Sequence, residues 1–402
     1  MPQVNLDWMI SVDDHVLEPP DLWQRWLPEK YKSQGPHIIE EDGEEFWAYD
    51  GKKIATESLA AVAGKDREDW TDESIRYSEM RRGCYDPVAR AKDMDEAGVL
   101  ASICFPSFPR FCGQVFWEGD DKELGLACVE AYNNFQIEEW AGSAPGRFIP
   151  IIILPLWDPV LAAAEVRRSF AAGARALAFS ENPTKLGLPS IYDTSNYWDP
   201  LWEACNETGM VVCMHIGSSS TMWAPSDLSP GIVRYITAPP TAISGAMTEW
   251  IFGPPFQKFP NLKIALAEGG IGWMPYFLER CEYTVAQHRS WMMKGTTLDA
   301  SEHAGVPDLM DFDVRETFRK HVYGCYINDE HGAKNIRSIG VDNVMAEMDY
   351  PHADSTWPDS ISFAQKQLEL TDLSDQEKYK VLRGNAERVF QFTPAEIPIL
   401  GK

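Results

Sequence analysis

The chain has 402 residues, of which 44% are hydrophobic, so it can build one large buried core or two ordinary ones, and general disorder is excluded. Its 36 basic and 61 acidic side chains give a formal net charge of −25, which would repel nucleic-acid phosphates and anionic lipid surfaces. We therefore expect neither a nucleic acid nor a membrane among the partners of this protein.

The longest apolar stretch lies around residues 148–157 and is too short to cross a bilayer. The first residues, MPQVNLDWMISV, have neither a basic start nor a small-residue cleavage site, so we expect a cytoplasmic protein. None of the eight cysteines forms a C-x-x-C pair with another. In a chain of this length that spacing argues against a disulfide framework and predicts buried thiols.

Short apolar runs rich in β-branched residues alternate with helix-like stretches, as expected for strands that are buried on both faces of a parallel sheet. The eight runs cover residues 8–16, 99–107, 147–156, 174–182, 210–218, 262–270, 321–329 and 343–351. Eight such strands predict the α/β class and a closed (β/α)8 TIM barrel. An open doubly wound sheet is the alternative, but no glycine-rich phosphate loop follows the first run.

An unusually long connection, residues 17–85, separates the first two predicted strands. Its Asp42-Gly43 and Asp50-Gly51 pairs stand at turn positions between strand-like runs, so we expect a small antiparallel β-meander there. Because the connection leaves the carboxyl end of the first strand, it could arch over the barrel mouth as a lid, or it could cover an edge of the barrel as a decoration. With this insertion included, we expect one domain over residues 1–402.

Three helices are marked by the same pattern, an Asp-Pro pair at the start and a glycine at the end, at residues 86–98, 158–173 and 199–209. The Asp can accept amide hydrogens of the first turn, the Pro needs no amide hydrogen there, and the Gly can adopt the left-handed conformation that ends a helix. The capping-box sequence Ser374–Glu377 predicts a C-terminal helical segment that ends near Gly384 and packs outside the barrel.

Polar side chains stand where several predicted strands end, and the active site of such a barrel forms at the carboxyl ends of its strands. Asp13 and His15 lie two residues apart on the first strand, so their side chains point to the same side. The other polar strand ends are His215, Glu268, Asp329 and Asp349. Each histidine alone is more often a hydrogen-bonded structural residue. The combination of Asp13, His15, His215 and Asp349 instead suits one divalent metal ion, zinc first, with manganese or iron(II) as alternatives.

Five motifs spread over nearly the whole chain carry a family resemblance. They are Asp13–Pro19 (DDHVLEP), Cys213–His215 (CMH), Pro260–Lys263 followed by Glu268–Gly270 (EGG), Met348–His352 (MDYPH) and Arg383–Ala386 (RGNA). The chain resembles the amidohydrolase superfamily, in the branch that contains aminocarboxymuconate-semialdehyde decarboxylase and γ-resorcylate decarboxylase. That resemblance implies that one metal ion is held by Asp13, His15, His215 and Asp349.

The chain departs from the pattern of this superfamily at two strand ends. Many relatives have His where Asp13 stands, although carboxylate-first versions occur in the decarboxylase branch. The sixth strand more often ends in His-Gly-Gly, and here Glu268 takes the place of that histidine. His352, just past the eighth strand, could substitute for the missing imidazole, or it could only hydrogen-bond the loop of Asp349. We take Asp349, Glu268 and His352 as the predicted catalytic residues.

Two reaction classes begin from the same metal site. In non-oxidative decarboxylation of an aromatic or unsaturated carboxylic acid, Asp349 delivers a proton to carbon as carbon dioxide leaves. In hydrolysis of an ester, amide or C–C bond, Asp349 accepts a proton from water, and Glu268 or His352 assists the leaving group. We expect decarboxylation ahead of hydrolysis, and a metal-stabilised barrel that binds a ligand without turnover as the third alternative.

Aromatic residues near the presumed mouth favour a flat substrate, with core packing as the alternative for each of them. The set comprises Phe105, Phe108, Phe111, Trp157, Trp223, Trp273 and Trp357, of which Phe105, Trp157, Trp223 and Trp357 are the predicted substrate contacts. The expected partner is thus a small-molecule carboxylic acid. Aromatic-rich loops are also compatible with a protein interface, so a homodimer is a further expectation.

Overall fold

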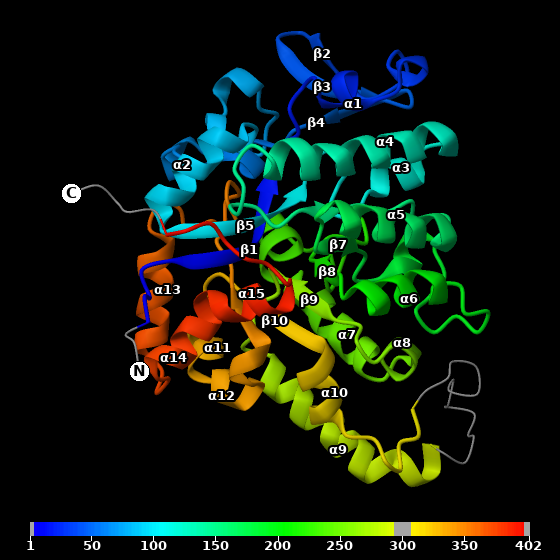
Figure 1. The fold of residues 1–402 in the computed structure, drawn as a ribbon, viewed down its shortest axis with the longest axis vertical. Coiled ribbons are helices and arrows are strands. Elements are labelled where there is room, and N and C mark those ends of the chain that lie inside the picture. The colour runs from blue at the N-terminus through cyan, green and yellow to red at the C-terminus, as the bar shows by residue number, and fades with distance from the viewer. Residues whose placement is uncertain (1–3, 293–306, 398–402) are drawn as a thin grey trace.

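The computed structural model describes residues 4–292 and 307–397 (Figure 1). Eight parallel strands, each within one of the predicted runs, lie at its centre. They are β1 (Met9–Val16), β5 (Val99–Pro106), β6 (Ile151–Ile152), β7 (Ala176–Phe179), β8 (Val211–His215), β9 (Ile264–Ala267), β10 (Val322–Tyr326) and β11 (Val344–Ala346). All residues of these strands are buried, which explains their uninterrupted apolar sequences. The predicted α/β class is confirmed.

The strands form two parallel sheets, β1-β5 and β11-β10-β9-β8-β7-β6. On one side, the amide of Ile149, just before β6, donates to the carbonyl of Ser102 in β5 at 2.9 Å. On the other side, the amide of Asp349, just after β11, donates to the carbonyl of Asp13 in β1 at 2.8 Å. The second contact brings the two ends of the chain together and places Asp349 beside Asp13.

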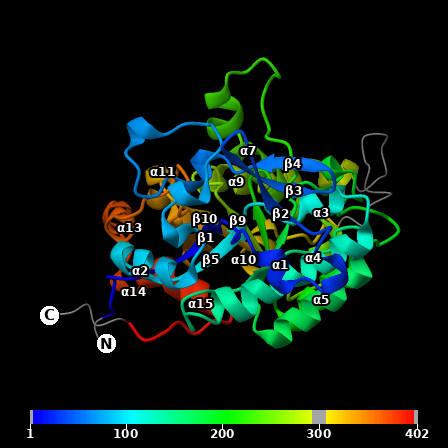
Figure 2. The same ribbon diagram turned by 90° about the horizontal axis from the view of Figure 1, so that it is seen from above.

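Helices surround the strands (Figures 1 and 2). They are α1 (Leu22–Trp26), α2 (Pro87–Ala97), α3 (Gln114–Glu118), α4 (Lys122–Asn134), α5 (Pro159–Ala172), α6 (Asp199–Thr208), α7 (Pro240–Ile251), α8 (Pro254–Lys258), α9 (Met274–Met292), α10 (Val314–His321), α11 (Glu330–Lys334), α12 (Ile336–Ile339), α13 (Ser360–Glu369), α14 (Asp375–Tyr379) and α15 (Asn385–Val389). Among the described residues, no helix combines the length and apolar character that a bilayer crossing requires. All eight cysteines are free and buried, as their spacing predicts.

The predicted start of a helix at Asp-Pro is correct for α2 and α5 and wrong in detail for α6. Asp86 and Asp158 each accept two amide hydrogens from the first turn of their helices. Asp199 instead lies inside α6, whose first flanking residue is Trp198, and its carboxylate pairs with Lys258 at 3.0 Å. A tertiary ion pair has replaced the local cap at this helix.

The C-terminal helical segment begins with the predicted capping box, in which Glu377 accepts the amide hydrogen of Ser374 at 2.8 Å. It does not end at Gly384 but continues through a π-helical turn into α15. Gly384 has a right-handed φ of −61°, so this glycine carries the helix on rather than stopping it.

The long insertion contains α1 and a three-stranded antiparallel sheet of β2 (His37–Glu41), β3 (Glu44–Tyr49) and β4 (Lys52–Ala55). Its two turns fall at Asp42-Gly43 and Asp50-Gly51, where all four residues have positive φ. In Figure 1 this sheet stands at the end of the molecule toward which the arrow of β1 points, and Figure 2 shows it in front of the central strands. The insertion therefore lies on the side where the polar strand ends gather.

Candidate metal centre

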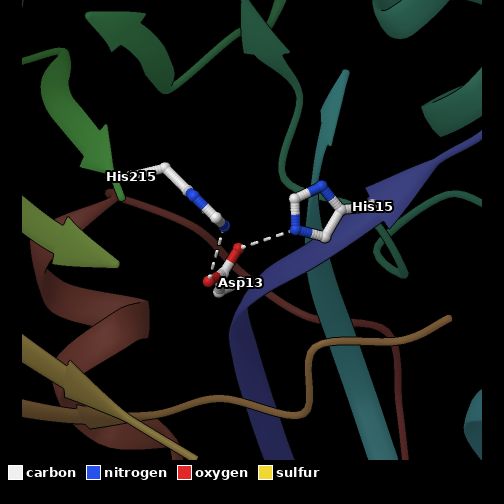
Figure 3. A group of neighbouring side chains, drawn as sticks. All are labelled: Asp13, His15 and His215. Atoms are coloured by element: carbon white, nitrogen blue, oxygen red, sulfur yellow. Dashed lines mark ion pairs between the residues drawn. The ribbon is translucent and has the colours of Figure 1, made fainter. Parts of the chain in front are cut away.

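Four side chains that lie far apart in the sequence meet at the carboxyl ends of the strands. Asp13 and His15 come from β1, His215 is the last residue of β8, and Asp349 follows β11. Asp13 bridges the two imidazoles, with its carboxylate oxygens 3.6 Å from His15 Nε2 and 3.4 Å from His215 Nε2 (Figure 3). Asp349 Oδ1 lies 3.3 Å from His15 Nε2. The structure thus brings together all four residues that the sequence proposes as metal ligands.

These donor atoms are buried and have no hydrogen-bond partners. The four residues are at most 1% exposed, and both oxygens of Asp13, both oxygens of Asp349 and Nε2 of each histidine are unpaired. Buried polar atoms are costly when unpaired, so such a group needs a cation to satisfy it. His215 Nδ1 donates to the carbonyl of Ile216 at 2.6 Å, so the lone pair of this imidazole is on Nε2, the nitrogen that faces Asp13. The residues present fit one divalent metal ion.

A positive charge at the cluster would also stabilise its ionised carboxylates, which burial and neighbouring negative charges disfavour. Burial, followed by the charges of Glu347 and Asp349, raises the pKa of Asp13 well above its usual range. Burial and the charge of Glu268 likewise raise the pKa of Asp349. Burial lowers the pKa of His15, so this imidazole is neutral, as a metal ligand must be.

The neighbours of the ligands hold β1 in place. Asp14 points away from the cluster and accepts hydrogen bonds from the Ser11 hydroxyl at 2.9 Å and from the Tyr350 amide at 3.2 Å. Arg90 is fully buried and donates to the backbone carbonyls of His15 at 2.5 Å and Gly83 at 2.7 Å. Because these bonds join β1 to the segment after β11 and to α2, they orient the ligand pair on β1.

The other two predicted catalytic residues border the ligand group. Glu268 Oε2 lies 2.9 Å from His215 Nε2. The ring of His352 stacks on that of His15 with centroids 3.6 Å apart, and its Nδ1 lies 3.3 Å from Asp349 Oδ1. The side chain of His352 is 18% exposed, so it links the buried Asp349 carboxylate to the outside.

The predicted substrate contacts are scattered. Phe105 lies beside the ligands, with its ring centroid 5.2 Å from that of His215. Trp157 instead packs against α4 beside Gly125, and the indole N–H of Trp357 donates to the carbonyl of Asp93 in α2. Trp223 is 46% exposed in the loop after β8. Of the four, Phe105 is the one whose ring lies against a proposed metal ligand, and the roles of Trp157, Trp223 and Trp357 as substrate contacts stay predictions.

Two residues at the centre were not among the predicted metal ligands, catalytic residues or substrate contacts, although Phe111 stands in the wider set of aromatic residues near the mouth. The ring of Phe111 stacks on that of His215, with centroids 4.2 Å apart and an angle of 11° between the planes. Glu347 is 3% exposed, and its Oε1 accepts the amide hydrogen of Glu268 at 3.2 Å. The spacing of Glu347, two residues before Asp349 in the run 343–351 that the sequence predicts as the eighth strand, is the signal that could have revealed it.

Known proteins resemble this chain over most of its length. It is 26% identical over 319 residues to a γ-resorcylate decarboxylase from Polaromonas sp. (strain JS666), covering 75% of this chain and 86% of that protein. An amidohydrolase from Mycobacterium avium subsp. paratuberculosis superposes with a TM-score of 0.70 at 22% identity, over 95% of this chain and 99% of that one. A dihydroxybenzoic acid decarboxylase from Polaromonas sp. JS666, solved with bound manganese and 2-nitroresorcinol, gives a TM-score of 0.60 at 18% identity, over 97% of this chain and 98% of that one.

A model of the amidohydrolase family matches residues 21–392, which is most of the chain and includes two of the four clustered ligands, His215 and Asp349. The resemblance that the five motifs predict is therefore confirmed, and this chain belongs to the amidohydrolase family.

Proposed function

We propose that this protein is a metal-dependent enzyme that removes carbon dioxide from an aromatic or unsaturated carboxylic acid without oxidation. The observation that carries the proposal is the set of buried, unpaired donors of Asp13, His15, His215 and Asp349 at the carboxyl ends of the strands. Two relatives that are named as decarboxylases of hydroxylated benzoic acids support this reaction over hydrolysis.

The four donors would hold one divalent ion. That ion would supply a Lewis acid for the substrate carboxylate and a neighbouring oxygen. The manganese of the dihydroxybenzoic acid decarboxylase favours Mn²⁺ here, with zinc and iron(II) as the alternatives.

The chain's own residues account for the proton. Decarboxylation breaks the bond between the carboxylate and the substrate carbon, and a new C–H bond at that carbon consumes one proton. Burial and the nearby charge of Glu268 raise the pKa of Asp349 in the metal-free protein, which opposes the lowering that a bound cation would cause, and Asp349 would deliver the proton from its place beside the metal site. His352 Nδ1 lies 3.3 Å from Asp349 Oδ1 and reaches the partly exposed side of the site, so His352 would return a proton to Asp349 after each turnover.

Aromatic rings would position the substrate. Phe105 and Phe111 both lie against His215, and Phe111 is parallel to its imidazole. A flat substrate placed between these rings would exclude water from the carbon that loses its carboxylate. We therefore propose Phe111, together with Phe105, as a substrate contact.

We also infer that the eight strands close into a (β/α)8 barrel of one domain and that the insertion 17–85 is its lid. Hydrogen bonds join the two sheets on both sides, as described above. The insertion starts and ends at one place, because the amide of Leu17 donates to the carbonyl of Cys84 at 3.0 Å. Within it, the amide of Val62 donates at 3.0 Å to the carbonyl of Pro351, the neighbour of His352. The cytoplasmic location and the homodimer stay predictions.

A substrate screen tests the function. The Mn²⁺-loaded protein would be incubated with hydroxybenzoates, muconate-like acids, esters and amides, and the products analysed by mass spectrometry. Loss of carbon dioxide without addition of water supports the proposal. A new acid together with an alcohol or amine would identify a hydrolase, and a ligand-induced rise in melting temperature without product would identify a binding protein.

Metal content tests the ligand set. We expect Asp13→Ala and His215→Ala to lose most of the bound metal, because each removes one donor from an already minimal set. Full metal content in both variants, measured after exhaustive dialysis, would contradict the assignment.

A further inference from the structure

We propose that Glu268 is a fifth protein ligand of the metal ion, aimed at it by Glu347. Glu268 stands directly after β9, on the strand next to the one that ends in His215. Its side chain is 15% exposed, and it meets the ligand group through His215, at 2.9 Å between Oε2 and Nε2. This inference presupposes the metal site of the proposed function and adds a residue to it.

The contact between Glu268 and His215 joins two atoms that both carry lone pairs. His215 Nδ1 donates its hydrogen to the carbonyl of Ile216, so Nε2 of the neutral ring is an acceptor, and it has no hydrogen-bond partner. A carboxylate oxygen is also an acceptor. Two acceptors 2.9 Å apart repel each other unless both bind one cation or the imidazole is protonated, and the ion that His215 Nε2 would bind supplies that cation.

The separation itself is typical of two ligands of one ion. Donors that bind a metal at about 2.0–2.2 Å stand roughly 3 Å apart. The pairs within the predicted ligand set, between Asp13, His15, His215 and Asp349, are separated by 3.3 to 3.6 Å. The distance between Glu268 Oε2 and His215 Nε2 is 2.9 Å, slightly shorter than these and close to the roughly 3 Å expected for two ligands of one ion.

The backbone of Glu268 is held in an unusual conformation that fixes the direction of its side chain. Its φ is +55°, in the left-handed region that a residue with a long side chain rarely adopts and that costs about 1–2 kcal/mol. The amide of Glu268 donates to Glu347 Oε1 at 3.2 Å, and Glu347 is 3% exposed. Glu347 is thus a positioning residue, because it acts on the site through the backbone of Glu268.

A fifth ligand of this kind affects which ion the site prefers. With Glu268 the donors are three carboxylates and two imidazoles, so oxygen outnumbers nitrogen. Oxygen-rich sites with more than four ligands suit Mn²⁺ better than Zn²⁺, which is usually four-coordinate. Glu268 would therefore raise the affinity for Mn²⁺ more than the affinity for Zn²⁺.

Titration of the metal-free, full-length protein with Mn²⁺, followed by the EPR signal of the free ion, tests the proposal. We expect Glu268→Gln to weaken Mn²⁺ binding about 10- to 100-fold and to weaken Zn²⁺ binding less. Asp354→Asn is the matched control, since this exposed carboxylate lies close enough to raise the pKa of Asp349 but contacts no ligand atom. It should change the Mn²⁺ affinity by no more than about fivefold.

Counting the water molecules on bound Mn²⁺ with ¹⁷O-labelled water separates a ligand from a mere neighbour. In the wild-type protein, five protein ligands leave one water on a six-coordinate ion, whereas four leave two. Glu268→Gln should add one water to the wild-type count. This measurement on the wild-type protein decides the question even if the variant does not fold.

Three outcomes would overturn the proposal. Two waters in the wild-type protein, or equal Mn²⁺ affinity in Glu268→Gln, would show that Glu268 is only an ion-pair partner of a protonated His215. The four-ligand site and the proposed function would survive that result. A wild-type protein that binds neither Mn²⁺ nor Zn²⁺ would overturn both.

Discussion

Asp349 combines two roles at the scale of single residues, because it is both a proposed metal ligand and the proposed proton donor. It has a φ of +58°, a left-handed conformation that Asp and Asn tolerate better than other non-glycine residues. The hydrogen bond that its backbone amide donates to the carbonyl of Asp13 does not involve the side chain. Asp349→Asn therefore removes the acid without disturbing the backbone.

We expect Asp349→Asn to lower the turnover number by about 10²- to 10⁴-fold, the usual contribution of a positioned acid or base. The melting temperature, followed by circular dichroism, should stay within a few degrees of wild type. Metal content must be measured on the same sample, so that loss of the ion can be separated from loss of the proton donor. Undiminished turnover would remove Asp349 from the mechanism.

Glu18 predicts a pH dependence of stability that is independent of the metal. It is 1% exposed, and its oxygens accept the amide hydrogens of Ser107 at 3.0 Å and Phe108 at 2.8 Å. Burial raises the pKa of Glu18 from 4.5 to about 7. The folded state then binds this proton more tightly than the unfolded state, so the free energy of unfolding falls as pH rises from about 4.5 to 7.

Glu18→Gln cannot titrate, so its free energy of unfolding should fall less than that of wild type between pH 4.5 and pH 7. Between pH 4.5 and pH 7, the free energy of unfolding of wild type should fall by at most about 3 kcal/mol more than that of Glu18→Gln. Urea denaturation of the metal-free proteins at both pH values measures it. Glu29→Gln, which changes an exposed carboxylate, should follow the wild-type slope, and a Glu18→Gln slope equal to wild type would contradict the burial argument.

At the scale of elements, two helices with the same Asp-Pro start are stabilised differently. Asp158 caps α5 by accepting the amide hydrogens of Val160 at 2.8 Å and Leu161 at 3.1 Å. Asp199 lies within α6 and pairs with Lys258. The ring of Trp198, the residue just before α6, packs with its centroid 5.0 Å from that of Phe179.

We expect Asp158→Ala to lower the free energy of unfolding by about 1 kcal/mol, the usual loss for a helix cap. Asp199→Ala loses only an ion pair that is about one-third exposed, which is worth about 0–1 kcal/mol. Urea denaturation of both variants makes the comparison. A larger loss for Asp199→Ala than for Asp158→Ala would show that the ion pair, not the cap, is the stronger constraint.

At the scale of the whole molecule, the proposed metal ion couples binding to folding. The donors that it would pair come from β1, β8 and the segment after β11, so it would join distant parts of the chain. We expect chelation to lower the melting temperature and Mn²⁺ to restore it, with a stabilisation of about 2.7 kcal/mol at one hundred times the dissociation constant. Calorimetry with Asp13→Ala as the insensitive control measures this, and an equal response of both proteins would indicate binding elsewhere.

The predicted homodimer can also be tested at this scale. Three large apolar residues are strongly exposed in the segment after β8: Leu228 at 94%, Ile232 at 66% and Tyr235 at 57%. Such groups often mark a protein interface. We expect light scattering to give twice the monomer mass and Tyr235→Glu to reduce it to the monomer mass, whereas a monomeric wild type would end the prediction.

The sequence by itself determined the α/β class, the positions of the eight strands, the family and the four clustered donors. These follow from local features: apolar runs, turn pairs, caps, and polar residues placed where a buried strand ends. The parity of Asp13 and His15 on one strand could likewise be read without coordinates. Applied to the predicted strand 343–351, the same rule would have included Glu347, two residues before Asp349.

Only the tertiary structure decided what surrounds the donors. Glu268 reaches His215 because its backbone is left-handed and held by Glu347. Phe111 stacks on His215 from a loop, and the conformation of a loop cannot be read from a periodic sequence pattern. Trp157 and Trp357 lie in turns and point toward α4 and α2, whereas Phe105 lies in β5 beside the donors. Local patterns specify which face a strand residue occupies, but the direction of a side chain in a loop depends on contacts between segments that are distant in the sequence.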